Sequence, residues 1–138
     1  MADKNKTIRI IFLVLALIYM GLIFYLSSMS QPGIARVKLI NMENFYGHVL
    51  EYGVLALFLF FALKGDNKDG KMMVLYLVCA ILIATMYGIT DEMHQFYVAG
   101  RVCDAFDVAA DCVGGILGAL MSFAIICRKR GERKGRGK

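Results

Sequence analysis

Four long stretches of apolar residues follow one another along the chain, and short polar segments separate them. The stretches cover residues 10–26, 47–63, 72–89 and 105–127. Each has a length close to the about 17 to 25 residues that a helix needs to cross a lipid bilayer. Because only helices and closed barrels satisfy the backbone inside lipid, the pattern predicts an all-α bundle of four transmembrane helices with short loops.

Composition supports a membrane protein, since 59% of the 138 residues are hydrophobic and only 20% are charged. Residues 1–127 are expected to form one transmembrane domain, and residues 128–138 a basic tail without regular structure. The first stretch is interpreted as a retained anchor rather than a signal peptide cleaved near Ser28 or Ser30, because it is long and further spans follow. Residues 34–42 are expected to form a short interfacial helix.

Lys and Arg residues gather on one side of the predicted bundle. All except Arg36, Lys38 and Arg101 fall in the N-terminal segment, the 64–71 turn or the C-terminal tail. Positive charge is retained in the cytoplasm, so a multi-pass protein of the bacterial plasma membrane with both termini cytoplasmic is expected. The tail is interpreted as a topology signal in contact with anionic lipid, and no nucleic-acid partner is expected, because no aromatic residues interleave its charges.

Ionisable residues intrude on the spans only at the opposite, extracytoplasmic end. Residues three, four or seven apart share one helix face, and lipid cannot solvate a charged face. Side chains from three helices are therefore expected to turn inward and form one polar pocket, with Arg101 paired to a carboxylate. The candidate residues are His48, Glu51, Tyr52, Asp91, Glu92, His94, Gln95, Arg101, Asp107 and Asp111.

Several roles for this pocket stay open at this point. A network of buried polar groups can simply hold helices together, although carboxylates here outnumber cations, which favours a ligand or a reaction. An imidazole could act as a general base, or the acidic groups could bind the polar head of an amphiphile. A divalent metal is a further alternative, and its candidate ligands are His48, Glu51, Asp91, His94 and Asp107.

Glycines in the fourth stretch indicate close helix packing. Gly114 and Gly118 form a G-x-x-x-G pair inside an apolar helix. Such a pair lets another helix approach closely, and packing within the bundle is favoured over packing against a second copy. The four Cys residues form no C-x-x-C pair and are interpreted as small core residues rather than metal ligands.

The same residues resemble the VanZ-like family of bacterial membrane proteins over about residues 9–127. The matching strings are His48-x-x-Glu51-Tyr52-x-x-Leu55, Asp91-Glu92-x-His94-Gln95-Phe96, and Gly100-Arg101 followed by Asp107-Val108, Asp111 and Gly114. Two positions depart from the family pattern. No basic residue stands in the four positions before His48, and Ala99 replaces the Pro that often precedes Gly-Arg.

The resemblance implies a polytopic membrane protein, and the family takes its name from a member linked to resistance to teicoplanin, a lipoglycopeptide. The leading hypothesis is an envelope protein whose extracytoplasmic pocket engages a lipid-linked or amphiphilic molecule. Membrane lipid, a lipid-linked cell-wall precursor and a lipoglycopeptide are the partners considered. The alternatives are a membrane-embedded metal- or His-dependent enzyme, and a non-catalytic structural or partner-binding subunit; neither a cofactor nor an oligomeric state is assigned.

Overall fold

Four helices make up the protein in a computed structural model that describes residues 2–30, 42–64, 69–101 and 103–135. They are α1 (Ala2–Ser27), α2 (Met42–Lys64), α3 (Gly70–Gln95) and α4 (Ala105–Gly135). All four are long and apolar enough to cross a membrane. The prediction of an all-α bundle of four transmembrane helices is therefore confirmed.

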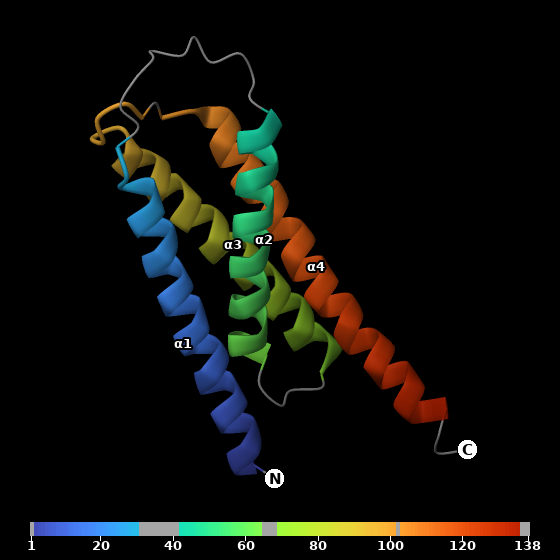
Figure 1. The fold of residues 1–138 in the computed structure, drawn as a ribbon. Helices are drawn as coiled ribbons and strands as arrows, with labels where there is room; N and C mark the ends of the chain where they lie inside the picture. The colour runs from blue at the N-terminus through green and yellow to red at the C-terminus, as the bar shows by residue number, and fades with distance from the viewer. Residues whose placement is uncertain (1, 31–41, 65–68, 102, 136–138) are drawn as a thin grey trace.

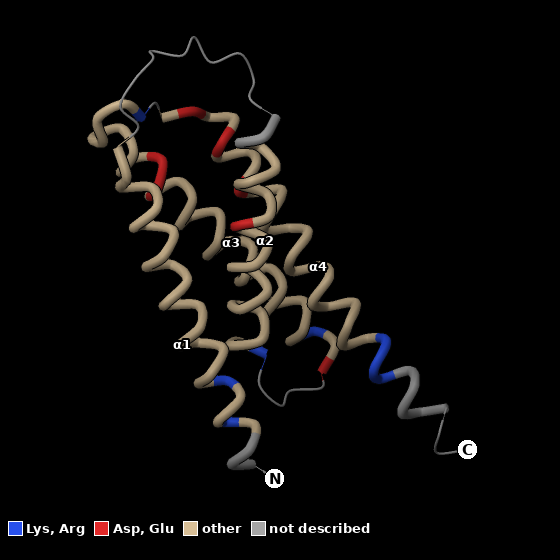
Figure 2. Tube along the Cα trace, viewed as in Figure 1, with Lys and Arg blue, Asp and Glu red and all other residues tan. Residues whose placement is uncertain are grey.

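The helices run up and down in chain order, and both ends of the chain lie at the same end of the bundle (Figure 1). We call this end the basic end, because Lys and Arg residues gather there (Figure 2). The opposite end carries most of the Asp and Glu residues of the described chain, and we call it the acidic end (Figure 2). The two ends differ in charge as the sequence pattern predicted.

Large apolar side chains cover much of the outer surface of the bundle. Ile18 is 65% exposed and Leu50 71% exposed, values that a water-soluble protein would avoid over so long a band. A smaller apolar core lies inside, where Tyr52, Leu55 and Phe60 of α2 are fully buried. The outer band gives the bundle an apolar surface of the kind that membrane-spanning helices carry, and the inner core holds the helices together.

Small residues bring α2 and α4 into contact backbone to backbone. A Cβ atom on Gly118 would overlap the carbonyl oxygen of Gly53, and one on Gly114 would overlap that of Val49. The glycine pair thus packs within the bundle, as the sequence favoured. Gly88 of α3 makes a similar approach, because a Cβ atom there would overlap the carboxylate of Asp111.

Two expectations concern segments outside the four predicted spans, namely the C-terminal tail and residues 34–42. Residues 128–135 continue α4 as helix, so the expectation that this part of the tail lacks regular structure is wrong. Arg, Lys and Glu are good helix formers, and extending an existing helix avoids the cost of starting a new one. The interfacial helix expected over residues 34–42 lies almost wholly outside the described residues.

Candidate functional site

His48, six residues after the start of α2, lies beside two aspartates of α4. Its Nδ1 atom is 2.8 Å from Oδ1 of Asp111, and its Nε2 atom is 4.0 Å from Oδ2 of Asp107. Asp107 and Asp111 lie four residues apart and so share one face of α4. The short contact is a hydrogen bond, whereas 4.0 Å is too long for one. With a neutral ring and an ionised Asp111, Nδ1 is the atom that donates to Asp111, because a carboxylate can only accept, and Nε2 then keeps a free lone pair.

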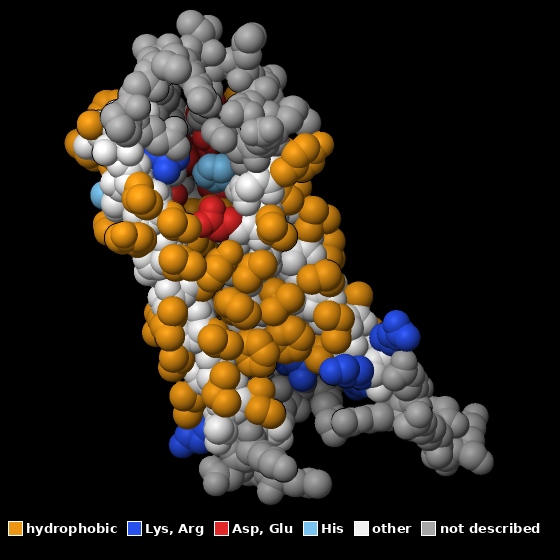
Figure 3. Space-filling model, in the orientation of Figure 1, with side chains coloured by type: hydrophobic (Ala, Val, Ile, Leu, Met, Phe, Trp, Pro, Cys, Tyr) orange, Lys and Arg blue, Asp and Glu red, His pale blue; other side chains and the backbone are white. Residues whose placement is uncertain are grey.

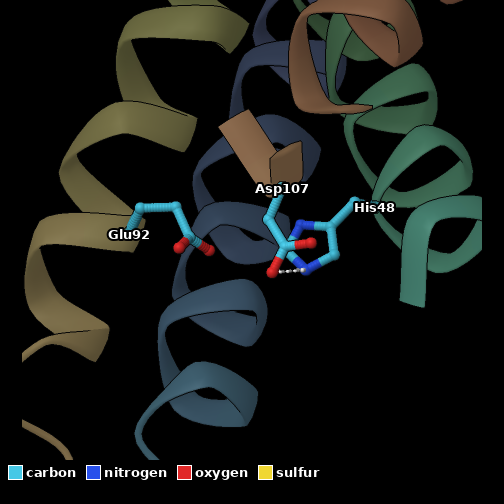
Figure 4. Close-up of side chains that lie close together, drawn as sticks. All are labelled: His48, Glu92 and Asp107. Carbon is cyan, nitrogen blue, oxygen red and sulfur yellow. Dashed lines mark ion pairs between the residues drawn. The ribbon is translucent and has the colours of Figure 1, made fainter. Parts of the chain in front are cut away.

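Glu92 brings α3 to the same place. It is only 1% exposed, and its Oε2 atom accepts a hydrogen bond of 2.9 Å from the backbone N–H of Asp104. Asp104 in turn caps α4, since its Oδ1 atom accepts from the N–H of Phe106. Ligand atoms of Glu92, His48 and Asp107 all lie within 4.8 Å of one another (Figure 4). We call His48, Glu92, Asp107 and Asp111 the His48 cluster.

A second group of polar side chains joins α3 to α1. Ser27 donates a hydrogen bond of 2.6 Å to Oδ1 of Asp91, and Gln95 donates one of 3.0 Å to Oδ2. Ser28 lies 3.0 Å from Nε2 of His94. We call these five residues the Asp91 cluster. Asp91 and Gln95 are buried, so the cluster fixes α1 against α3 at the acidic end.

Arg101 follows a turn in which Gly100 has a φ of 82°, a left-handed conformation that favours glycine. Its guanidinium donates a hydrogen bond of 3.2 Å to the backbone carbonyl of Leu26, at the end of α1. The expected partner was a carboxylate, and among the described residues Arg101 bonds to this carbonyl instead. The contact ties the segment before α4 to the end of α1.

Glu51 and Tyr52 lie between the two clusters. Glu51 is half-buried, and the charges of His48, Asp91 and Arg101 all act on it. The ring of Tyr52 is parallel to that of His48, with centroids 6.3 Å apart. Acidic and histidine side chains appear together in the upper part of the face shown in Figure 3, flanked by hydrophobic side chains. The acidic end therefore combines buried charge with an apolar surround.

Of the five residues proposed as metal ligands, the structure divides four between the two clusters, and Glu51 belongs to neither. The three residues whose ligand atoms lie together include His48 and Asp107. By contrast, Asp91 bonds to Ser27 and His94 to Ser28, at the end of α1. Glu92, which was in the pocket set but not in the metal set, takes the third position. Ser28 was considered only as part of a possible cleavage site and Ser27 was assigned no role, and no local pattern indicated that they would meet α3.

Three kinds of chemistry fit this arrangement. Carboxylates can accept hydrogen bonds from hydroxyl or ammonium groups of a ligand. An imidazole held by an aspartate has the orientation used for general base catalysis. A histidine with two carboxylates also offers the mixed nitrogen and oxygen donors that divalent transition metals accept.

Comparison with known proteins adds one decisive observation. The family model described as VanZ/LLP1 matches residues 11–127. The chain belongs to the VanZ/LLP1 family. The match includes every residue of both clusters, and VanZ/LLP1 membership agrees with four membrane-spanning helices. No curated protein matches the chain, and no solved structure does.

Proposed function

We propose that this VanZ/LLP1 chain is an envelope protein of the bacterial plasma membrane that binds the polar head of an amphiphilic or lipid-linked molecule. The head group lies at the acidic end, and the acyl part lies against the apolar helices. The observation that carries the proposal is the burial of Glu92, Asp107 and Asp111 from two helices beside His48 of a third. Charged groups within membrane-spanning segments are costly and usually serve a ligand or a reaction.

The acidic end faces the outside of the cell in this proposal. The basic end carries Lys and Arg residues next to the spans, which favours its retention in the cytoplasm. Both termini are then cytoplasmic, and the two clusters lie near the head groups of the outer leaflet. An outward site is accessible to cell-wall precursors and to lipoglycopeptides, whose sugar hydroxyl and amine groups are donors for carboxylates.

Native mass spectrometry of protein extracted with its own membrane lipid tests this proposal. The native chain is expected to retain an amphiphile of defined mass, and Asp111→Asn is expected to lose it. Asp69→Asn is the matched control, because Asp69 caps α3 at the basic end and asparagine caps a helix equally well. A native chain that carries no defined amphiphile, or an Asp111→Asn chain that retains it, would refute the proposal.

Growth in teicoplanin supplies a second measurement in cells. Expression of the native chain and of Asp69→Asn is expected to raise the inhibitory concentration, and expression of Asp111→Asn is not. A glycopeptide without an acyl chain is the control compound, because the proposal requires an amphiphile. If Asp111→Asn protects fully but unfolds at a much lower temperature, the His48 cluster serves cohesion alone.

A membrane-embedded metal- or His-dependent enzyme is the second candidate. It is favoured by the hydrogen bond from His48 to the buried Asp111, which fixes the imidazole as a triad aspartate does. The same mass spectrometry separates the two candidates. An enzyme would convert the retained amphiphile to a species of different mass during incubation, whereas a binding protein would release it unchanged.

A further inference from the structure

Three donor atoms from three different helices surround one point inside the bundle. His48 belongs to α2, Glu92 to α3 and Asp107 to α4, and their ligand atoms lie within 4.8 Å of one another. Nε2 of His48 and Oδ2 of Asp107 are 4.0 Å apart. Two ligands of one tetrahedral zinc ion lie about 3.4 Å apart, given bonds of about 2.1 Å. The His48 and Asp107 atoms would therefore need to close by about 0.6 Å, and no pair by more than about 1.4 Å, to share an ion.

An unsatisfied oxygen at the same place is an independent indication of a cation. Oε1 of Glu92 is buried and has no hydrogen-bond partner within the described chain, while Oε2 is bonded to Asp104. Figure 4 shows the Glu92 carboxylate pointing toward Asp107 and His48. A buried carboxylate oxygen without a partner is costly, and a metal ion at this point would satisfy it.

Asp111 supplies the support that a metal-binding histidine usually has. Its Oδ1 atom is 2.8 Å from Nδ1 of His48, and the side chain is fully buried. Ligand histidines commonly donate their second ring N–H to a carboxylate, which fixes the tautomer and the ring orientation. The close approach of Gly88 leaves Asp111 no space to turn away in that direction. Nε2 is thus presented to the point between Glu92 and Asp107.

The donor types select the class of ion. Magnesium and calcium prefer oxygen ligands throughout, and copper(I) and iron–sulfur centres require sulfur. One imidazole with two carboxylates offers the nitrogen and oxygen donors that zinc and other divalent first-row transition metals accept. The two carboxylates balance the double positive charge of such an ion. This balance lowers the cost of burying the ion and both carboxylates in a region of low dielectric.

We propose that His48, Glu92 and Asp107 bind one divalent transition-metal ion, with Asp111 as the residue that positions His48. This goes beyond the proposed function, because the ion binds whether or not an amphiphile is present. Three protein ligands leave one coordination position open, as in metal sites that accept a substrate. Zinc is the ion with which the proposal is tested.

The test is a zinc titration of the purified full-length chain in detergent, after treatment with a chelator and removal of lipid. The native chain is expected to bind one zinc ion per chain in competition with a coloured chelator, and magnesium is not expected to displace it. Glu92→Gln is expected to weaken zinc binding by more than about 100-fold, because it removes a ligand, whereas loss of a supporting residue costs about 10- to 100-fold. Asp111→Asn is expected to weaken zinc binding by about 10- to 100-fold, because it removes only the residue that supports His48.

Asp69→Asn is the control, since it removes a carboxylate charge at the basic end, where Asp69 caps α3 away from the three ligands. Its zinc affinity is expected to equal that of the native chain. X-ray absorption of the bound zinc is expected to show one imidazole with oxygen neighbours. A native chain that binds no zinc overturns the proposal whatever the variants do, as does equal loss of zinc affinity in Asp69→Asn and Glu92→Gln. A native chain that retains the amphiphile but binds no zinc when zinc is supplied would refute the metal site and leave the proposed function standing.

Discussion

Replacement of Gly118 by alanine tests the closest helix contact in the bundle. A Cβ atom at Gly118 would overlap the carbonyl oxygen of Gly53, which belongs to the rigid backbone of α2. Gly115 on the same helix is the matched control, because a Cβ atom there would lie 3.5 Å from Cβ of Ala84, an ordinary contact. The two changes add the same methyl group to one helix and differ only in what it meets.

The expected difference follows from two terms. Gly→Ala favours the helix by about 1 kcal/mol at either position, so this term cancels in the comparison. Overpacking costs about 1 to 3 kcal/mol when the neighbour is well packed, and here α2 must move away as a unit. Gly118→Ala is therefore expected to be less stable than Gly115→Ala by about 1 to 3 kcal/mol.

Unfolding in mixed micelles with increasing SDS measures this difference. Tyrosine fluorescence is a suitable signal, because the chain has seven Tyr residues and no Trp. The free energies of unfolding of the two variants are compared after linear extrapolation. Equal stability, or a less stable Gly115→Ala, would refute the reasoning, since it would mean that α2 and α4 do not meet at Gly118.

Two further predictions concern the acidic end and the orientation. Ser27→Ala is expected to lose about 1.5 to 3 kcal/mol in the same unfolding measurement, because it removes the donor to the buried charge of Asp91. Ser28→Ala, at an exposed site, is expected to change stability by less than about 0.5 kcal/mol, and an equal loss in both would contradict the prediction. Cys103 and Cys127 are both free and exposed, at opposite ends of the bundle. A membrane-impermeant thiol reagent is expected to label Cys103 in intact spheroplasts and Cys127 only after lysis, and the reverse pattern would refute the proposed orientation.

The number of spans and the charge of each end could be predicted from the sequence because they depend on long, additive patterns. A long apolar stretch indicates a membrane span whatever it packs against. An excess of Lys and Arg likewise indicates the side of the membrane without any knowledge of packing. The close packing of Gly114 and Gly118 could be predicted for a similar reason, since a stripe of small residues has few other uses in an apolar helix. The identity of the partner helix, α2, could be established only from the structure.

The division of the polar residues into two clusters could not be predicted. Asp91 and Glu92 are neighbours in the chain, yet consecutive residues of a helix point about 100° apart at 3.6 residues per turn. Asp91 therefore meets Ser27 of α1, while Glu92 meets the start of α4. Spacing showed that Asp91 and His94 share a face, but it could not show which helix that face would meet.

The contact between α2 and α4 also explains how the His48 cluster is assembled. Val49 meets Gly114 and Gly53 meets Gly118, so the two helices run parallel and stay in step over one turn. His48 is next to Val49 and Asp111 lies one turn before Gly114, so the close contact at Val49 and Gly114 holds the two side chains within reach of the 2.8 Å hydrogen bond. A larger residue in the glycine stripe would separate the helices and lengthen that bond. The small residues thus determine the geometry of a polar site that they do not themselves enter.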